Sequence, residues 1–266
     1  MLVAISTGII GLIAGGSVAQ AATLTLAMAG FQASIGALND LHDRVDDAVG
    51  QAWKPIPSGR VGPGAARSVV FVGAVVGSAG SVVLGPATLL VGAAGYGLGV
   101  AYDLGLKRTP WGWACFALAL PLVPVYAWLG VGAGLPPNVG TLVLLGALAG
   151  TELAVANGLV DIGTDTGVGT AGVVVRLGQR RARSAMVATA LGTLAVAWLS
   201  TLLGGGLVGT TAPTVASLVA PIIGSAVLLA GVAMSLRSGA IWSWRGWHVQ
   251  ALGVAILALT WIVAAS

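Results

Sequence analysis

Acidic residues recur at helical spacing in the segment 39–47, which reads Asn-Asp-Leu-His-Asp-Arg-Val-Asp-Asp. Successive residues of a helix turn by about 100°, so an amide and three carboxylates of this segment fall on one face. They are Asn39, Asp40, Asp43 and Asp47. Carboxylates held this close repel one another unless a cation neutralises them, and hard divalent ions such as Mg²⁺ prefer oxygen ligands. The segment therefore predicts a divalent-cation site.

A second acidic segment, 157–165, repeats this arrangement. Asn157, Asp161 and Asp165 are spaced i, i+4 and i+8, which again aligns an amide with two carboxylates. Mg²⁺ is usually bound by one or two carboxylates together with phosphate oxygens and water, so two such clusters predict a pair of Mg²⁺ ions bridging a diphosphate. The alternative is that the acids only solvate the ends of membrane segments and pair with nearby arginines, which would not require helical phasing twice.

Cations lie close to both acidic segments. Lys54 opens the segment Lys-Pro-Ile-Pro-Ser-Gly at 54–59, and Lys107 and Arg108 follow Tyr102. Beside metal-bound phosphate, these cations would neutralise a departing diphosphate. Each of them alone also fits an anchor at the membrane interface.

The elements that position these residues must be membrane-spanning helices. Of the 266 residues, 57% are hydrophobic and only 8% charged, against roughly 25% charged in soluble domains, and the mean hydropathy is +0.97. This composition excludes a soluble globular fold. Cutting the apolar runs at charges, prolines and polar clusters predicts nine spans in one all-α domain covering 1–266. The spans are 2–17, 20–38, 67–85, 86–104, 112–132, 138–159, 184–204, 214–235 and 247–265.

The 12 Lys and Arg residues indicate the orientation of these spans. All of them lie in the connections after the even-numbered spans, and the connections after spans one, three, five and seven contain none. The positive-inside rule then places the N-terminus and the acid-bearing loops in the cytoplasm and the C-terminus outside. The net charge of +4 is explained in this way and gives no support to nucleic-acid binding. Seven of the eight acids lie at the same face, and only Glu152 lies well inside a span.

Taken together, these motifs resemble those of the UbiA-type intramembrane prenyltransferases. The resemblance rests on the segment 39–47, the loop 54–59, the segment 102–107, and the pair Asp161 and Asp165 followed by Val-Arg-Leu-Gly at 175–178. The motifs occur in the family's order and spacing, and the resemblance covers essentially the whole chain. The family usually has an arginine where this chain has Lys54.

The resemblance implies a bundle of nine membrane helices around a central cavity that opens sideways to lipid, with the acidic motifs at its cytoplasmic end. One Mg²⁺ would be bound by Asp40, Asp43 and Asp47, with Asn39 assisting, and a second by Asp161 and Asp165. The diphosphate would be held by Lys54, Tyr102 and Lys107, joined by Arg108, by Asn39 of the first motif and by Asn157 of the second. The implied activity is Mg²⁺-dependent transfer of a prenyl group from a polyprenyl diphosphate to a small aromatic acceptor, giving a product such as a quinone precursor.

Loss of the diphosphate leaves an allylic carbocation, which survives only where an apolar cavity keeps water out. Two other fates of this cation stay open: capture by the substrate's own double bonds, as in a UbiA-type terpene cyclase, and transfer to a non-aromatic lipid acceptor. A cation-coupled transporter is a third hypothesis. It predicts acids near the membrane midplane and broken helices in matching halves, whereas seven of the eight acids lie at one face and no inverted repeat is apparent.

Overall fold

The described part of the chain consists of helices and the loops between them. This computed structural model describes residues 1–136, 138–168, 171–202 and 215–265 and contains no strand among them. The helices are α1 (Leu2–Ile13), α2 (Val18–Gly50), α3 (Pro63–Leu84), α4 (Pro86–Leu104), the short 3₁₀ helix η1 (Leu106–Arg108), α5 (Gly112–Gly130), α6 (Val139–Val168), α7 (Val173–Leu202), α9 (Val215–Ser235) and α10 (Ala240–Ala265). Eight of these helices are long and apolar enough to cross a membrane, and α1, with 12 residues, is a shorter apolar helix. The predicted all-α membrane fold of nine α-helices is confirmed for the described residues.

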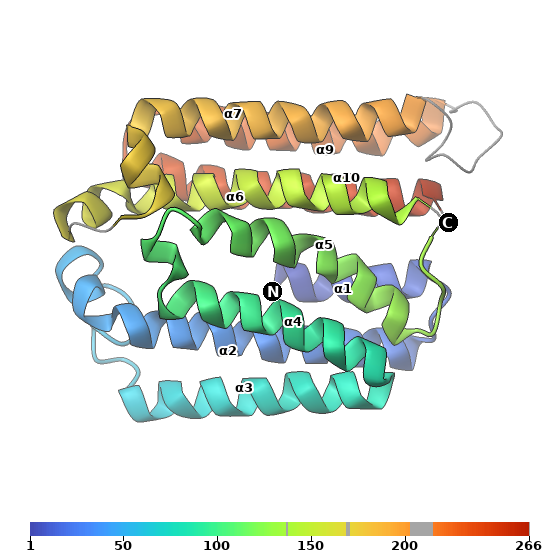
Figure 1. Cartoon of the computed structure of the whole chain (residues 1–266), viewed down its shortest axis with the longest axis horizontal. Helices are drawn as coiled ribbons and strands as arrows, with labels where there is room; N and C mark the ends of the chain where they lie inside the picture. Colours follow the sequence, from blue (N-terminus) through green and yellow to red (C-terminus); the bar gives the residue numbers. More distant parts are fainter. Residues whose placement is uncertain (137, 169–170, 203–214, 266) are drawn as a thin grey trace.

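The chain runs back and forth, so that alternate connections meet at one end of the bundle. The connections after α2, α4 and α6 lie at the left of Figure 1, and the C-terminus lies at the opposite end. Arg183 in α7 donates a hydrogen bond from Nη2 to the carbonyl oxygen of Arg237, which follows α9, so this connection belongs to the same end. All four basic connections are therefore gathered at one end of the bundle.

Two helices continue past their apolar segments and carry the acidic motifs. α2 runs to Gly50 and includes 39–47, and α6 runs to Val168 and includes 157–165. The helical backbone assumed for both motifs is therefore confirmed. At its other end α2 begins with a capping box, in which Ser17 and Gln20 satisfy each other's backbone N–H groups.

Two spans were also predicted to start too late, because hydropathy detects only the part of a helix that lies in lipid. α7 begins at Val173 rather than at 184, and α10 begins at Ala240 rather than at 247. The added turns of α7 are rich in arginine, which disfavours burial in lipid but is compatible with helical hydrogen bonding. Gly178 interrupts α7 with φ 73° and ψ 156°, a backbone conformation that only glycine adopts at low cost. The uninterrupted helical stretch of α7 therefore starts immediately after Gly178.

Helices α2 and α3 pack backbone to backbone through glycine. A Cβ atom added at Gly30 would lie 2.7 Å from the carbonyl oxygen of Gly73, and one added at Gly73 would lie 2.6 Å from that of Gly30. Neither backbone can move away without separating the two helices. The contact is therefore possible only because both residues lack a side chain. The close contact with α3 fixes the position of α2, which carries the first acidic motif.

We expect Gly30→Ala to lower the stability of the bundle by about 1–3 kcal/mol, because the new methyl group overlaps the α3 backbone. Gly36→Ala, the same change in the same helix, is the matched control, since a Cβ atom there has no neighbour within 4 Å. Thermal unfolding of the detergent-purified proteins measures the difference. Equal melting temperatures for the two variants would contradict this account of the α2–α3 contact.

Candidate active site

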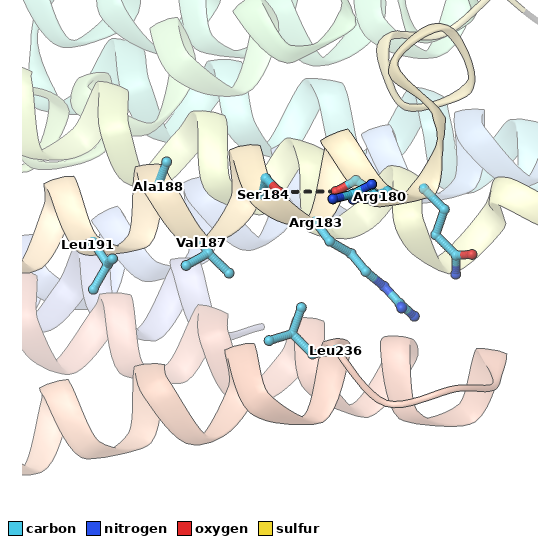
Figure 2. A pocket seen from close by; sticks show the side chains of 8 residues that line it. Arg180, Arg183, Ser184, Val187, Ala188, Leu191 and Leu236 are labelled. Carbon is cyan, nitrogen blue, oxygen red and sulfur yellow. Dashed lines mark hydrogen bonds between the residues drawn. The ribbon is translucent and has the colours of Figure 1, made fainter.

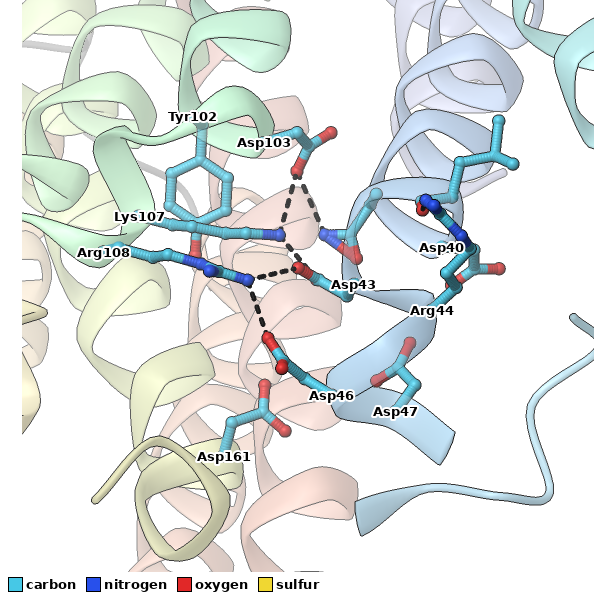
Figure 3. A network of polar contacts seen from close by, with 12 residues as sticks. Asp40, Asp43, Arg44, Asp46, Asp47, Tyr102, Asp103, Lys107, Arg108 and Asp161 are labelled. Carbon is cyan, nitrogen blue, oxygen red and sulfur yellow. Dashed lines mark hydrogen bonds and ion pairs between the residues drawn. The ribbon is translucent and has the colours of Figure 1, made fainter. Parts of the chain in front are cut away.

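Acidic side chains from the last turns of α2 meet cations from two neighbouring connections at the end of the bundle that carries the basic loops (Figure 3). α2 contributes the carboxylates of Asp40, Asp43, Asp46 and Asp47. The facing cations come from η1, which follows α4, and from the loop after α2. The rest of α2 is apolar and crosses the membrane. The helix therefore holds its charged end at the membrane surface.

The 3₁₀ turn η1 brings two cations onto α2. Lys107 Nζ lies 2.5 Å from Asp43 Oδ2 and 4.0 Å from Asp103 Oδ1. Arg108 Nη2 lies 2.7 Å from Asp46 Oδ2 and 3.6 Å from Asp43 Oδ1. The Lys107 side chain is 13% exposed and the Arg108 side chain 40%, so Lys107 forms the inner, less solvated part of the contact. Both cations predicted from this segment therefore reach the first acidic motif.

Lys54 reaches the same motif from the loop that follows α2. Its Nζ lies 2.9 Å from both carboxylate oxygens of Asp47 and 3.8 Å from Asp40 Oδ1. The loop folds back because Ser58 N donates to the Lys54 carbonyl and Gly59 takes a positive φ of 74°, which returns the chain towards α3. Asp47 is only 5% exposed, so its charge depends on this lysine for compensation.

Asp103, at the end of α4, belongs to this network although the sequence analysis gave it no role. The residue is 1% exposed, and its Oδ1 accepts a hydrogen bond of 3.0 Å from Asn39 Nδ2. Its Oδ2 is buried and has no hydrogen-bond partner in the described part of the chain. Two signals were available in the sequence: Asp103 follows Tyr102 directly, and it lies at the same membrane face as the other acids.

The second acidic motif approaches the first from α6. Gln51, just after α2, donates a 3.2 Å hydrogen bond from Nε2 to Asp161 Oδ1, and Figure 3 shows Asp161 on the side of the network towards Asp46. Asn157 Nδ2 donates a 3.3 Å hydrogen bond to the hydroxyl of Tyr102 in α4. Gln51 is a second contact that the sequence analysis missed. The side chain of Asp165 lies outside the described residues, although its backbone continues α6.

The chemistry of this donor set fits a divalent cation. Six carboxylates, from Asp40, Asp43, Asp46, Asp47, Asp103 and Asp161, gather with three ion-paired cations, so negative charge is in excess. All the donors are hard oxygens of the kind that Mg²⁺ prefers, and Oδ2 of Asp103 is unsatisfied. Among the described side chains, no three of the His, Cys, Asp and Glu residues lie close enough together to hold a metal ion. Lys54 contacts both Asp40 and Asp47, and Lys107 contacts both Asp43 and Asp103, so in this arrangement each lysine already compensates a pair of carboxylates.

Solved structures of similar fold include three with high coverage. An apo UbiA homologue from Aeropyrum pernix K1 has a TM-score of 0.75 and 18% identity, covering 97% of this chain and 94% of that one. A UbiA homologue from Archaeoglobus fulgidus bound to GPP and Mg²⁺ has a TM-score of 0.70 and 17% identity, covering 96% and 93%. A digeranylgeranylglyceryl phosphate synthase has a TM-score of 0.67 and 16% identity, covering 98% and 92%. At these identities the likeness establishes the shared fold.

Comparison of the sequence with family models shows the family to which the chain belongs. None of the curated proteins matches the chain. Residues 1–231, however, match the model of the UbiA prenyltransferase family, and this range contains both acidic motifs and all the cations of the site. The chain therefore belongs to the UbiA prenyltransferase family.

Proposed function

We propose that this chain is a single-domain, Mg²⁺-dependent prenyltransferase spanning 1–266. It ionises a polyprenyl diphosphate at the acidic end of the bundle and transfers the prenyl group within the membrane to an acceptor that we expect to be aromatic. The observation that carries this proposal is the pairing of Lys54 and Lys107 with the carboxylates of the α2 motif, directly above an apolar helix bundle. Family membership supports it, as do solved UbiA homologues described as bound to GPP and Mg²⁺ or to DMAPP and Mg²⁺.

Each predicted site residue has a role in this proposal. Asp40, Asp43 and Asp47 would hold one Mg²⁺, with Asn39 assisting, and Asp161 and Asp165 would hold a second. The diphosphate would lie against Lys54, Tyr102, Lys107, Arg108 and Asn157, and Asn39 would face both the metal and the diphosphate. Bound Mg²⁺ supplies positive charge to the diphosphate oxygens as negative charge builds up on them. The protein supplies both anionic ligands for the metal and cationic side chains for the substrate from the same small region.

The reaction begins with heterolysis of the carbon–oxygen bond between the prenyl group and the diphosphate. The electron pair leaves with the diphosphate, whose charge Lys54, Lys107 and Arg108 stabilise. The apolar helices keep water from the allylic cation that remains, and aromatic faces stabilise it. The acceptor then forms a new bond to the cationic carbon. An aromatic acceptor loses its ring proton to an aspartate or to the released diphosphate, which restores its aromaticity.

We also propose that the acidic end of the bundle faces the cytoplasm, with the N-terminus inside and the C-terminus outside. This orientation is supported by the 12 Lys and Arg residues, which lie in or close to the connections at the end of the bundle opposite the C-terminus. Cysteine accessibility tests it: a cysteine replacing Ser58, in the α2–α3 loop, should react with membrane-impermeant reagents only in inverted vesicles. Labelling from the outer face of intact cells would reverse the assignment.

We expect purified protein to release diphosphate from geranyl, farnesyl or geranylgeranyl diphosphate only when Mg²⁺ is present. Release that also requires an aromatic acceptor supports the proposed transfer. Release without any acceptor, accompanied by a cyclic hydrocarbon, indicates a terpene cyclase instead. Release that requires a glycerol-based lipid indicates a non-aromatic acceptor, an alternative favoured by the likeness to the digeranylgeranylglyceryl phosphate synthase. If folded protein releases no diphosphate under any of these conditions, the enzyme proposal fails and ion transport becomes the next activity to test.

A further inference from the structure

A groove lies on the surface of the bundle between α7 and the end of α9, and none of the residues that line it belongs to the acidic network (Figure 2). It has a volume of about 570 Å³. Its walls are apolar along α7, where Val187, Ala188 and Leu191 face it, and at Leu236, which follows α9. Leu191 and Leu236 are exposed in the isolated bundle, at 53% and 42%, so in the membrane this surface must be covered by something apolar.

One end of this groove is strongly cationic. Arg180 and Arg183 line it, and Arg183 donates from Nη2 to the carbonyl of Arg237, while its buried Nε has no hydrogen-bond partner in the described part of the chain. The two connections that meet at this end, before the crossing part of α7 and after α9, carry six arginines: Arg176, Arg180, Arg181, Arg183, Arg237 and Arg245. None of the six forms an ion pair with a described acid; among the cations of the chain only Lys54, Lys107 and Arg108 do. The positive charge of this cluster is therefore not compensated by any described acid, and an anionic ligand would find it available.

The length of the groove matches one leaflet of a bilayer. From Arg180 to Leu191 the helix rises by ~17 Å, and half of the hydrocarbon core is ~15 Å thick. Deeper in the membrane, a 3.0 Å hydrogen bond from Trp198 Nε1 to Ser225 Oγ joins α7 to α9 and closes the space between them. A ligand in this groove therefore has an anionic head at the arginine end and an apolar tail directed towards the centre of the bilayer.

We propose that this groove binds an anionic phospholipid of the cytoplasmic leaflet. The phosphate lies against the guanidinium groups of Arg180 and Arg183, which line the arginine end of the groove. One acyl chain follows Val187, Ala188 and Leu191 towards Trp198. The break at Gly178 contributes as well, because it starts a new helical stretch at the arginine end, and the partial positive charge of a helix N-terminus favours a phosphate there.

Native mass spectrometry of the purified protein tests this proposal with vesicle lipids as the probe. The protein is exchanged into micelles containing equal amounts of phosphatidylglycerol and phosphatidylcholine, and the lipid retained by each variant is compared. The wild-type protein should retain phosphatidylglycerol preferentially. The double variant Arg180→Gln/Arg183→Gln should lose this preference by about 10- to 30-fold, because each arginine near an anionic surface contributes about fivefold. Arg67→Gln, which removes an exposed arginine at the same end of the bundle on α3, should retain the preference.

A second variant tests the apolar part of the groove without changing its charge. Ala188 is exposed on the groove wall, so Ala188→Phe fills the path of the acyl chain and leaves both arginines in place. It should lose retained phosphatidylglycerol while melting at the wild-type temperature in lipid-free detergent. Three results would overturn the proposal: retention unchanged in the double variant, an equal loss in Arg67→Gln, or displacement of the lipid by inorganic phosphate at similar concentrations, which would mean that the arginines bind phosphate without a chain.

Discussion

We expect Asp43→Asn to reduce Mg²⁺-dependent diphosphate release by about 10³-fold, since loss of metal-centred charge stabilisation costs several kcal/mol in the transition state. Asp43 is the carboxylate that both cations of η1 approach, with Lys107 Nζ at 2.5 Å and Arg108 Nη2 at 3.6 Å. It therefore lies at the centre of the charge network. The amide in the variant has nearly the same shape but carries no negative charge. Release is measured under saturating prenyl diphosphate across a Mg²⁺ titration, so that weaker metal binding and slower chemistry are distinguished.

The matched control is Asp46→Asn, the same change three residues further along the same helix. Asp46 carries an ion pair with Arg108 but lies outside the proposed metal ligands, and its side chain is 32% exposed. A solvated ion pair of this kind contributes about 1 kcal/mol or less, so release should fall by less than about tenfold. Both variants must elute as monodisperse protein with similar melting temperatures. Equal losses in the two variants would show that the motif acts only through its total charge, and that Asp43 has no special role.

The arrangement of the membrane helices follows largely from the sequence. Apolar runs and the one-sided distribution of cations suffice because lipid allows only hydrogen-bonded helices to cross it and because cations are retained on one side. The same reasoning fails where helices leave the lipid. The early start of α7 at Val173 is an example, because hydropathy carries no information on whether the arginine-rich turns are helical.

The residues of the candidate site could be predicted from the sequence, but most of the contacts between them could not. Asp40, Asp43 and Asp47 were identifiable because their spacing within one helix fixes their common face. Asp103 and Gln51 were missed, because their roles depend on the offset of α4 and of α6 along α2, and this offset is set by side-chain packing between the helices. A single sequence contains the residues of such a contact but does not identify them as partners.

Lys107→Gln is expected to have opposite effects on catalysis and on metal binding. The ammonium group lies 2.5 Å from Asp43 and 4.0 Å from Asp103, so in the absence of substrate it neutralises carboxylates that we propose to be close to the metal. During the reaction the same group is needed by the departing diphosphate. Turnover should therefore fall by about 10²- to 10³-fold, the usual effect of removing one donor from a developing oxyanion. Mg²⁺ alone should bind the substrate-free variant about tenfold more tightly, because a competing positive charge has been removed.

Isothermal titration of Mg²⁺ into substrate-free protein, together with the diphosphate-release assay, separates these two effects. Arg67→Gln removes one positive charge from an exposed position at the same end of the bundle and should change neither quantity by more than about twofold, because the charge there is screened by solvent. If Lys107→Gln slows turnover but leaves Mg²⁺ binding unchanged, the lysine acts on the diphosphate alone and the contact with Asp43 is incidental. If both change in the expected directions, the ion pairs of the substrate-free site hold each lysine on a carboxylate until metal and diphosphate arrive together. Such a site would keep its carboxylates neutralised between turnovers, at a membrane surface where uncompensated negative charge is costly.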